Sequence, residues 1–165
     1  MIELKNLTKR YGNTLAVNCL NLRVSKGEIY GFIGPNGAGK TTTIRMMGGV
    51  LAPTEGSVII DGVNMADDPE RVKRTIGFIP DRPFLYEKLT GMEFMKFSAE
   101  LYGVEDHAFS EKAEAFLKKF ALHNWAHELI ESYSPGMKQR LIITAAHLHD
   151  PAVINVDDPM VGLDP

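Results

Sequence analysis

The sequence predicts an α/β protein with a parallel sheet at its centre, and three observations support this prediction. An apolar run over residues 27–34 leads directly into a glycine-rich loop and a short apolar helix. A second apolar run, residues 152–156, ends in the adjacent pair Asp157 and Asp158. Strands and helices alternate along the chain between these two runs. Parallel sheets bind ligands at the carboxyl ends of their strands. A glycine-rich loop after one strand and two aspartates after another are therefore typical of a parallel α/β sheet.

The first sixty residues favour strands. Residues 2–7 and 14–24 alternate apolar and polar side chains, as half-buried antiparallel strands do. Residues 27–34 are nearly continuously apolar, which predicts a strand buried on both faces. Residues 56–62 read as a further short strand with a glycine at each end. We therefore expect an antiparallel β subdomain at the N-terminus, before the parallel core.

The middle of the chain favours amphipathic helices, because its apolar residues recur at helical spacing. The two stripes are Phe94, Phe97 and Leu101, and then Phe109, Ala113, Phe116, Leu117 and Phe120. We expect these stripes to form core and the charges between them to face water. A last helix is predicted to begin at Ser134, a good N-cap, with Pro135 in its first position, and to end before Pro151.

Composition and net charge exclude several classes of protein. With 44% hydrophobic and 24% charged residues, the 165-residue chain is long enough for one domain with a real core. The net charge of −3 gives no support for a nucleic-acid partner. The single cysteine, Cys19, rules out an internal disulfide and is expected to be a small core residue. No signal-peptide pattern and no apolar run of membrane-spanning length is visible, which predicts a soluble intracellular chain.

Residues 34–41, Gly-Pro-Asn-Gly-Ala-Gly-Lys-Thr, match the phosphate-binding loop pattern of P-loop NTPases in full. The glycines allow backbone N–H groups to approach phosphate oxygens, and the following helix N-terminus favours an anion. Lys40 is expected to reach the β- and γ-phosphates, and the Thr41 hydroxyl to ligate Mg²⁺. An ordinary glycine-rich turn is the alternative, but the predicted strand before the motif and helix after it favour the nucleotide site.

A Mg²⁺–nucleotide site needs a second anionic ligand from a neighbouring strand. Asp157, at the end of the apolar run 152–156, is the candidate carboxylate. Taken alone, an apolar run ending in two aspartates could be a strand followed by a turn. Combined with the phosphate loop, it predicts a metal-binding carboxylate.

The whole chain resembles the ATPase subunit of an ATP-binding cassette (ABC) transporter, and most of all the bacterial exporter-type subunits. The motifs that carry the resemblance are residues 10–12 (RYG), 34–42, 133–140 (YSPGMKQR), 156–159 (VDDP) and 162–165 (GLDP). Residues 133–140, here called the signature segment, resemble a sequence found only in this family. The resemblance implies a P-loop NTPase core with an inserted helical subdomain at about residues 90–131. It also implies that the chain is one incomplete nucleotide-binding domain, because family members continue past residue 165.

The resemblance further implies an ATP- and Mg²⁺-dependent motor on the cytoplasmic face of the membrane. Two subunits would pair head to tail, and the helical subdomain would dock on an integral membrane subunit. Tyr11 would stack on adenine, and Ser134, Gly136 and Asp164 would act at the nucleotide of the opposite subunit. The nucleotide-binding residues of the loop would be Gly34, Asn36, Gly37, Ala38, Gly39, Lys40, Thr41 and Thr42.

Three positions depart from the family pattern. Asp158 stands where the family has the glutamate that orients the hydrolytic water, which places its carboxylate roughly 1 Å short and can slow hydrolysis about a hundredfold. Asp81 replaces a glutamine near Mg²⁺ and is either a further metal ligand or a solvent-facing turn residue. Pro135 replaces the first signature glycine and removes one N–H donor.

The first functional hypothesis is therefore an ATPase motor subunit of a membrane exporter, with Lys40 and Asp158 in catalytic roles. The second is a truncated chain that binds nucleotide or a partner without hydrolysing ATP by itself. Turnover by the isolated chain would separate these two. A third, an ABC protein of chromosome repair or translation, is disfavoured because no long coiled coil and no second cassette is present.

Overall fold

The computed structural model describes residues 1–81 and 84–157. The chain divides into two compact units, Met1–Ile76 and Gly77–Pro165, and each is described by itself. The described part is mixed α/β, with an antiparallel sheet in the first unit and a parallel strand pair in the second.

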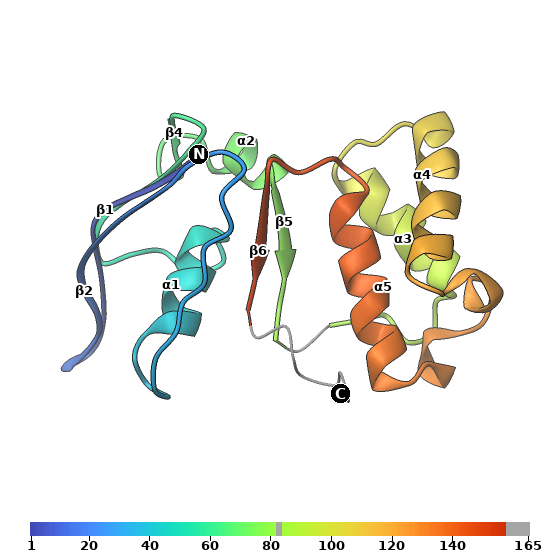
Figure 1. Cartoon of the computed structure of the whole chain (residues 1–165), viewed down its shortest axis with the longest axis horizontal. Coiled ribbons are helices and arrows are strands. Elements are labelled where there is room, and N and C mark those ends of the chain that lie inside the picture. Colours follow the sequence, from blue (N-terminus) through green and yellow to red (C-terminus); the bar gives the residue numbers. More distant parts are fainter. Residues whose placement is uncertain (82–83, 158–165) are drawn as a thin grey trace. The chain divides into compact units, whose positions relative to one another are not determined.

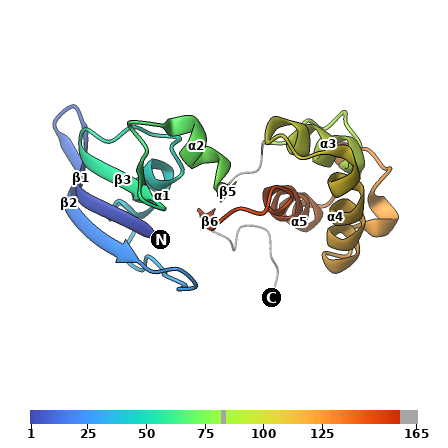
Figure 2. The same cartoon turned by 90° about the horizontal axis from the view of Figure 1, so that it is seen from above.

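The first unit is built on an antiparallel sheet of four strands in the order β2-β1-β3-β4. Figure 2 shows β1 between β2 and β3. The long strands β1 (Ile2–Tyr11) and β2 (Thr14–Val24) pair from Ile2 opposite Val24 to Tyr11 opposite Thr14. β3 (Glu55–Ile60) lies on the other side of β1, and β4 (Val63–Asn64) closes the edge. The predicted antiparallel subdomain is therefore confirmed.

Alternation along these strands buries one set of side chains, as the sequence pattern indicated. The buried apolar residues of the sheet are Ile2, Leu4, Leu7, Val17, Val24, Val58 and Ile60. Helix α1 (Lys40–Met47) adds Met46 and Met47 to this core, and α2 (Pro69–Arg74) adds Val72. Gly48 is the C-cap of α1.

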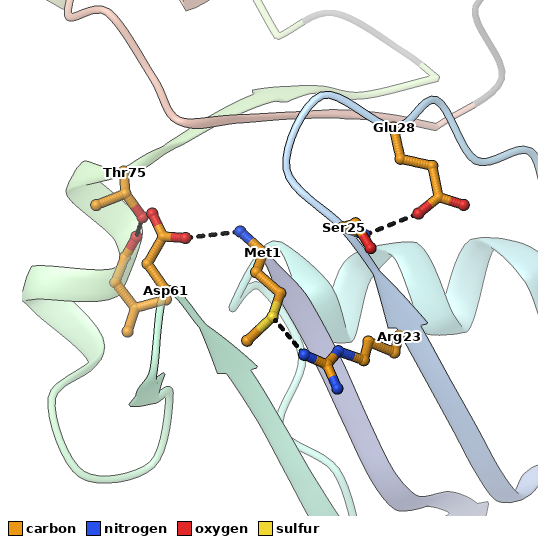
Figure 3. Close-up of polar contacts among 7 residues, drawn as sticks. Met1, Arg23, Ser25, Glu28, Asp61 and Thr75 are labelled. Carbon is orange, nitrogen blue, oxygen red and sulfur yellow. Dashed lines mark hydrogen bonds and ion pairs between the residues drawn. The ribbon is translucent and has the colours of Figure 1, made fainter.

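Polar contacts lie at the end of the sheet where β1 begins and β2 ends (Figure 3). The amino group of Met1 donates to Asp61 Oδ1 at 2.6 Å, which joins the start of β1 to the turn between β3 and β4. After β2, the Ser25 N–H donates to Glu28 Oε2 at 2.8 Å, and the Glu28 N–H donates to the Ser25 carbonyl at 3.2 Å. This closed turn is where the chain leaves the sheet toward the phosphate loop.

Two expectations for the first unit are wrong. Residues 28–35 form no strand, and Ile29 and Ile33 are 100% and 99% exposed. A strand buried on both faces needs neighbours on each side, and among the described residues this segment pairs with none. Cys19 is exposed rather than buried, since its backbone adopts a positive φ of 45° at an irregular point of β2.

The second unit contains the parallel pair β5 (Ile76–Ile79) and β6 (Val153–Val156) and the helices α3 (Gly91–Leu101), α4 (Asp106–Lys119) and α5 (Pro135–His147). Two short 3₁₀ turns, η1 (His123–Trp125) and η2 (Ile130–Ser132), lie between α4 and α5. Figures 1 and 2 show α5 between the strand pair and α4. A Cβ on Gly77 of β5 would lie 2.6 Å from the Ala146 carbonyl of α5, so glycine permits this close approach.

The helices share one continuous core, which includes Phe94, Met95, Ala99, Phe109, Ala113, Leu117, Ile130, Leu141 and Leu148. The predicted helices are confirmed, and the strand predicted over residues 152–156 is β6, Val153–Val156. Thr90 caps α3 and forms a capping box with Glu93. The predicted stripe on α3 is wrong at two positions. The buried face of the helix uses Met95 and Ala99, so Phe97 is 38% exposed and Leu101 is 67% exposed.

Candidate functional site

The phosphate loop connects the irregular segment 28–35 to the first turn of α1. Gly37 and Gly39 both have φ of +82°, a left-handed conformation that favours glycine. A Cβ on Gly39 would lie 2.3 Å from the Ala16 carbonyl oxygen of β2. Thr43 locks the turn, because its N–H and its hydroxyl both donate to the Gly39 carbonyl, at 2.8 and 2.9 Å. The loop therefore lies against β2 with no room for a side chain.

Lys40 folds back over the loop. Its Nζ donates to the carbonyl oxygens of Gly34 at 2.6 Å and Pro35 at 2.7 Å. The ammonium group is thus bonded to carbonyl oxygens of the loop, which it can exchange for phosphate oxygens. Such an exchange replaces neutral acceptors with charged ones and gives stronger hydrogen bonds.

A hollow of about 450 Å³ adjoins the loop, a size typical of small-molecule sites. Its walls come from β2, from the end of the irregular segment and from the loop itself. The lining residues are Leu15, Ala16, Val17, Asn18, Leu20, Phe32, Ile33, Gly37, Ala38, Gly39, Lys40 and Thr43. The mixed apolar and loop lining could take a nucleoside beside its phosphates.

Tyr11, the expected adenine platform, ends β1 in the same unit. Its side chain is 50% exposed, and Lys9 Nζ lies 5.4 Å from the ring centroid. Tyr11 is not among the residues that line the hollow. Its stacking on adenine stays a prediction.

In the second unit, the two strand ends carry the expected acids. Asp157 follows β6 directly, is 2% exposed, and donates its N–H to the Ile79 carbonyl of β5 at 2.9 Å. Asp81 is half-buried and follows β5 after Pro80. Because β5 and β6 are parallel, both acids lie at the same end of the strand pair. The phosphate loop belongs to the other unit. Asp158 and Asp164 lie outside the described residues.

The signature segment forms the start of α5, as predicted. Ser134 is the N-cap, and its hydroxyl accepts from the Met137 N–H at 3.3 Å. The Ser134 carbonyl accepts from the Lys138 N–H at 2.9 Å, which closes the first turn. Pro135 occupies the first helical position, so Gly136 carries the first backbone N–H of the helix proper, and this N–H has no partner one turn earlier in the helix. The arrangement offers a hydroxyl and an N–H at a helix N-terminus, which suits an anion.

The comparisons with known proteins agree with these motifs. A family model described as ABC transporter matches residues 17–161. The chain belongs to the ATP-binding cassette transporter family. The bacitracin transport ATP-binding protein BcrA of Enterococcus faecalis is 43% identical over 165 residues, which are 100% of this chain and 53% of that protein. The chain thus spans about half the length of that curated relative.

Solved structures of the ABC family show the same fold. The structure of an ATP-binding subunit of an ABC transporter matches with a TM-score of 0.92 and 34% identity, over 100% of this chain and 69% of that one. A dimeric ATP-binding cassette in a post-hydrolysis state, bound to ADP and Pi, matches with a TM-score of 0.88 and 29% identity, over 99% and 76%. The predicted P-loop NTPase fold is therefore confirmed.

The residues expected to hold Mg²⁺ have the chemistry that this ion prefers. The Thr41 hydroxyl, in the first unit, and the Asp157 carboxylate, in the second, are each hard oxygen donors, and Mg²⁺ is usually held by one or two carboxylates together with substrate phosphates and water. Among the described residues, no group of three or more His, Cys, Asp or Glu side chains could hold a metal by itself. Within the same part of the chain, no helix is long and apolar enough to cross a membrane.

Sequence reasoning missed two features beside the signature segment. Gln139 is 1% exposed, and neither of its amide atoms has a hydrogen-bond partner among the described residues. Lys138 pairs with Glu87 at 2.5 Å, and this contact, with the Lys138 charge, lowers the pKa of Glu87. In a Lys-Gln-Arg run, all three side chains would be expected to face water. No sequence pattern pairs residues 87 and 138, which are far apart along the chain.

Proposed function

We propose that this chain binds Mg²⁺-ATP through its phosphate loop and that the complete protein hydrolyses ATP to drive an ABC exporter. The observation that carries the proposal is the loop itself, with Gly37 and Gly39 in the left-handed conformation, Gly39 close against β2, and the Lys40 ammonium bonded to loop carbonyls. The fully retained motif supports the same conclusion.

The residues divide the work by their chemistry. Lys40 and the loop N–H groups bind the β- and γ-phosphates, and Thr41 and Asp157 would hold the Mg²⁺, which neutralises charge on the transferred phosphate. Asp158 orients the attacking water. Ser134 and Gly136 contact the γ-phosphate held by a second copy, and Asp164 lies at the same contact. The solved dimeric relative supports a paired arrangement.

The exporter assignment rests on the relative named for bacitracin transport. We place the working protein on the cytoplasmic face of the membrane, bound to an integral membrane subunit. The helical subdomain, about residues 90–131, supplies the docking face.

An exposed aromatic patch supports this docking face. Phe84 is 83% exposed and meets Tyr86 edge-on at 6.2 Å, and Tyr86 meets Phe97 edge-on at 5.5 Å. Leu101 follows Phe97 by one helical turn, so it lies on the same face of α3. These four residues are here called the aromatic patch, after Phe84, Tyr86 and Phe97, and aromatic side chains are enriched at the core of protein interfaces.

We expect Leu101→Asp to reduce co-purification of the complete protein with its membrane subunit about tenfold, because an unpaired carboxylate would have to be buried in the interface. Val50→Asp is the matched control, since Val50 is 64% exposed and Leu101 is 67% exposed. Recovery of membrane subunit is measured from detergent extracts. Equal recovery for both variants, or co-purification with ribosomes instead, would contradict the proposed partner.

A further inference from the structure

The segment that enters α3 and the segment that enters α5 are joined along their backbones. The Glu131 N–H donates to the Glu87 carbonyl at 3.1 Å, and the Ile130 N–H donates to the Leu89 carbonyl at 2.9 Å. In the other direction, Gly91 donates to Glu128 at 3.3 Å. An isolated antiparallel bridge pairs Thr90 with Leu129. This ladder fixes the register of residues 87–91 against residues 128–131.

Two ion pairs flank the ladder. Lys138 Nζ lies 2.5 Å from Glu87 Oε1, and Lys88 Nζ lies 2.6 Å from Glu131 Oε2. They differ in exposure, because the Lys138 side chain is 24% exposed and the Lys88 side chain is 83% exposed. The pair of Glu87 with Lys138 is therefore the less screened of the two. It is also the one that reaches α5.

The pair of Glu87 with Lys138 connects the start of α5 with the segment that carries the aromatic patch. Lys138 closes the first turn of α5 through its own N–H, which donates to the Ser134 carbonyl. Glu87 is the next residue after Tyr86, whose ring forms the middle of the aromatic patch. Tyr86 of the aromatic patch and Glu87, whose carboxylate pairs with Lys138 in the first turn of α5, are therefore adjacent in the chain.

Close contacts of Tyr133 also fix the segment that leads into α5. The Tyr133 hydroxyl donates to the Trp125 carbonyl at 2.5 Å, and a Cβ on Gly91 would lie 2.3 Å from that hydroxyl. Tyr133 is 4% exposed and immediately precedes Ser134. The signature turn is therefore held from both sides, by Tyr133 before it and by Lys138 within it.

We propose that Glu87 is a positioning residue that, through Lys138, couples the aromatic patch to the first turn of the signature helix. Binding of the membrane subunit to the patch then sets how Ser134 and Gly136 are presented to the γ-phosphate. This inference rests on the proposed function. An exposed ion pair contributes little to stability, so loss of the pair should leave the fold intact.

The first test needs no nucleotide and no partner. In the 165-residue chain, Glu87→Gln should speed amide hydrogen exchange at Lys138, Ile130 and Glu131 about two- to fivefold, because the junction opens more often. The matched control is Glu114→Gln, which breaks the pair of Glu114 with Lys118 at 2.6 Å within α4. Equal exchange at these three amides in both variants would overturn the coupling role.

The second test measures function in the complete protein with its membrane subunit. Glu87→Gln should lower partner-stimulated kcat about tenfold, on the scale of a lost coupling contact, and leave KM for ATP within about twofold. The charge exchange Glu87→Lys with Lys138→Glu should restore at least half of the stimulation. Glu3→Gln, which breaks the pair of Glu3 with Lys5 at 3.2 Å outside the helical subdomain, should change neither constant. Glu87→Gln can speed amide hydrogen exchange while the wild-type protein shows no stimulation by the membrane subunit. In that case the proposed function fails, and the structural link between Glu87 and the first turn of α5 stands. Unchanged stimulation in Glu87→Gln would overturn the coupling.

Discussion

Gly39→Ala is expected to reduce Mg²⁺-ATP affinity at least about a hundredfold, because the phosphate loop can no longer lie against β2. The new Cβ would stand 2.3 Å from the Ala16 carbonyl and 3.1 Å from Val17 Cγ2, and the first of these is backbone that cannot rotate away. The left-handed φ of +82° adds about 1–2 kcal/mol of strain for a residue with a side chain. Loop atoms must then move by more than the tolerance that phosphate contacts allow.

Gly62→Ala is the matched control for this substitution. Gly62 has a φ of +80°, and a Cβ added there would meet no atom within 4 Å, so alanine carries the conformational cost without the clash. Both variants should lose stability from backbone strain, measured by urea unfolding, and only Gly39→Ala, which adds the clash, should also lose affinity for the nucleotide. If Gly39→Ala binds Mg²⁺-ATP within about threefold of the wild type, the close packing of loop and strand is not required for binding.

Asp158→Glu is expected to raise ATP turnover of the completed domain, by up to about a hundredfold, because the longer side chain moves the carboxylate roughly 1 Å toward the water. Asp158 lies outside the described residues, so this expectation comes from its place directly after Asp157. Turnover is measured as phosphate release at saturating Mg²⁺-ATP. No gain in turnover would mean that aspartate already works at this position.

Asp157→Glu is the control for Asp158→Glu, and we expect the opposite effect on ATP turnover. Asp157 is 2% exposed, and its N–H is bonded to Ile79 at 2.9 Å, so the site has little room for another methylene. Asp157→Glu should therefore lower turnover, since overpacking a buried site shifts the groups around it. A gain from both substitutions would show that side-chain length at Asp158 has no special role.

Much of the fold could be predicted from local patterns. Alternation marked β1 and β2, and Ser134 with Pro135 marked the start of α5. The pattern failed at residues 28–35, because an apolar run shows that a segment favours burial but not which strand pairs with it. It failed again on α3, where the i, i+3, i+7 spacing fitted Phe97 and Leu101 although Met95 and Ala99 form the buried face.

The local motifs of the candidate site could also be predicted from the sequence, and its long-range contacts could not. The phosphate loop and the signature turn are contiguous in sequence, so their motifs were visible without a structure. The contact of Gly39 with Ala16 and the pair of Glu87 with Lys138 join distant segments, and only the folded chain brings them together. Long-range contacts of this kind leave no periodic signal.

The most direct test of the nucleotide site is a calorimetric titration of Mg²⁺-ATP into the purified 165-residue chain. We expect saturable binding in the wild type, loss of binding in Lys40→Ala because the phosphates lose their cationic partner, and unchanged binding in Lys26→Ala, which removes an exposed lysine outside the loop. Circular dichroism establishes that each variant is folded. No saturable binding by the folded wild-type chain, or equal binding by Lys40→Ala, would contradict the account.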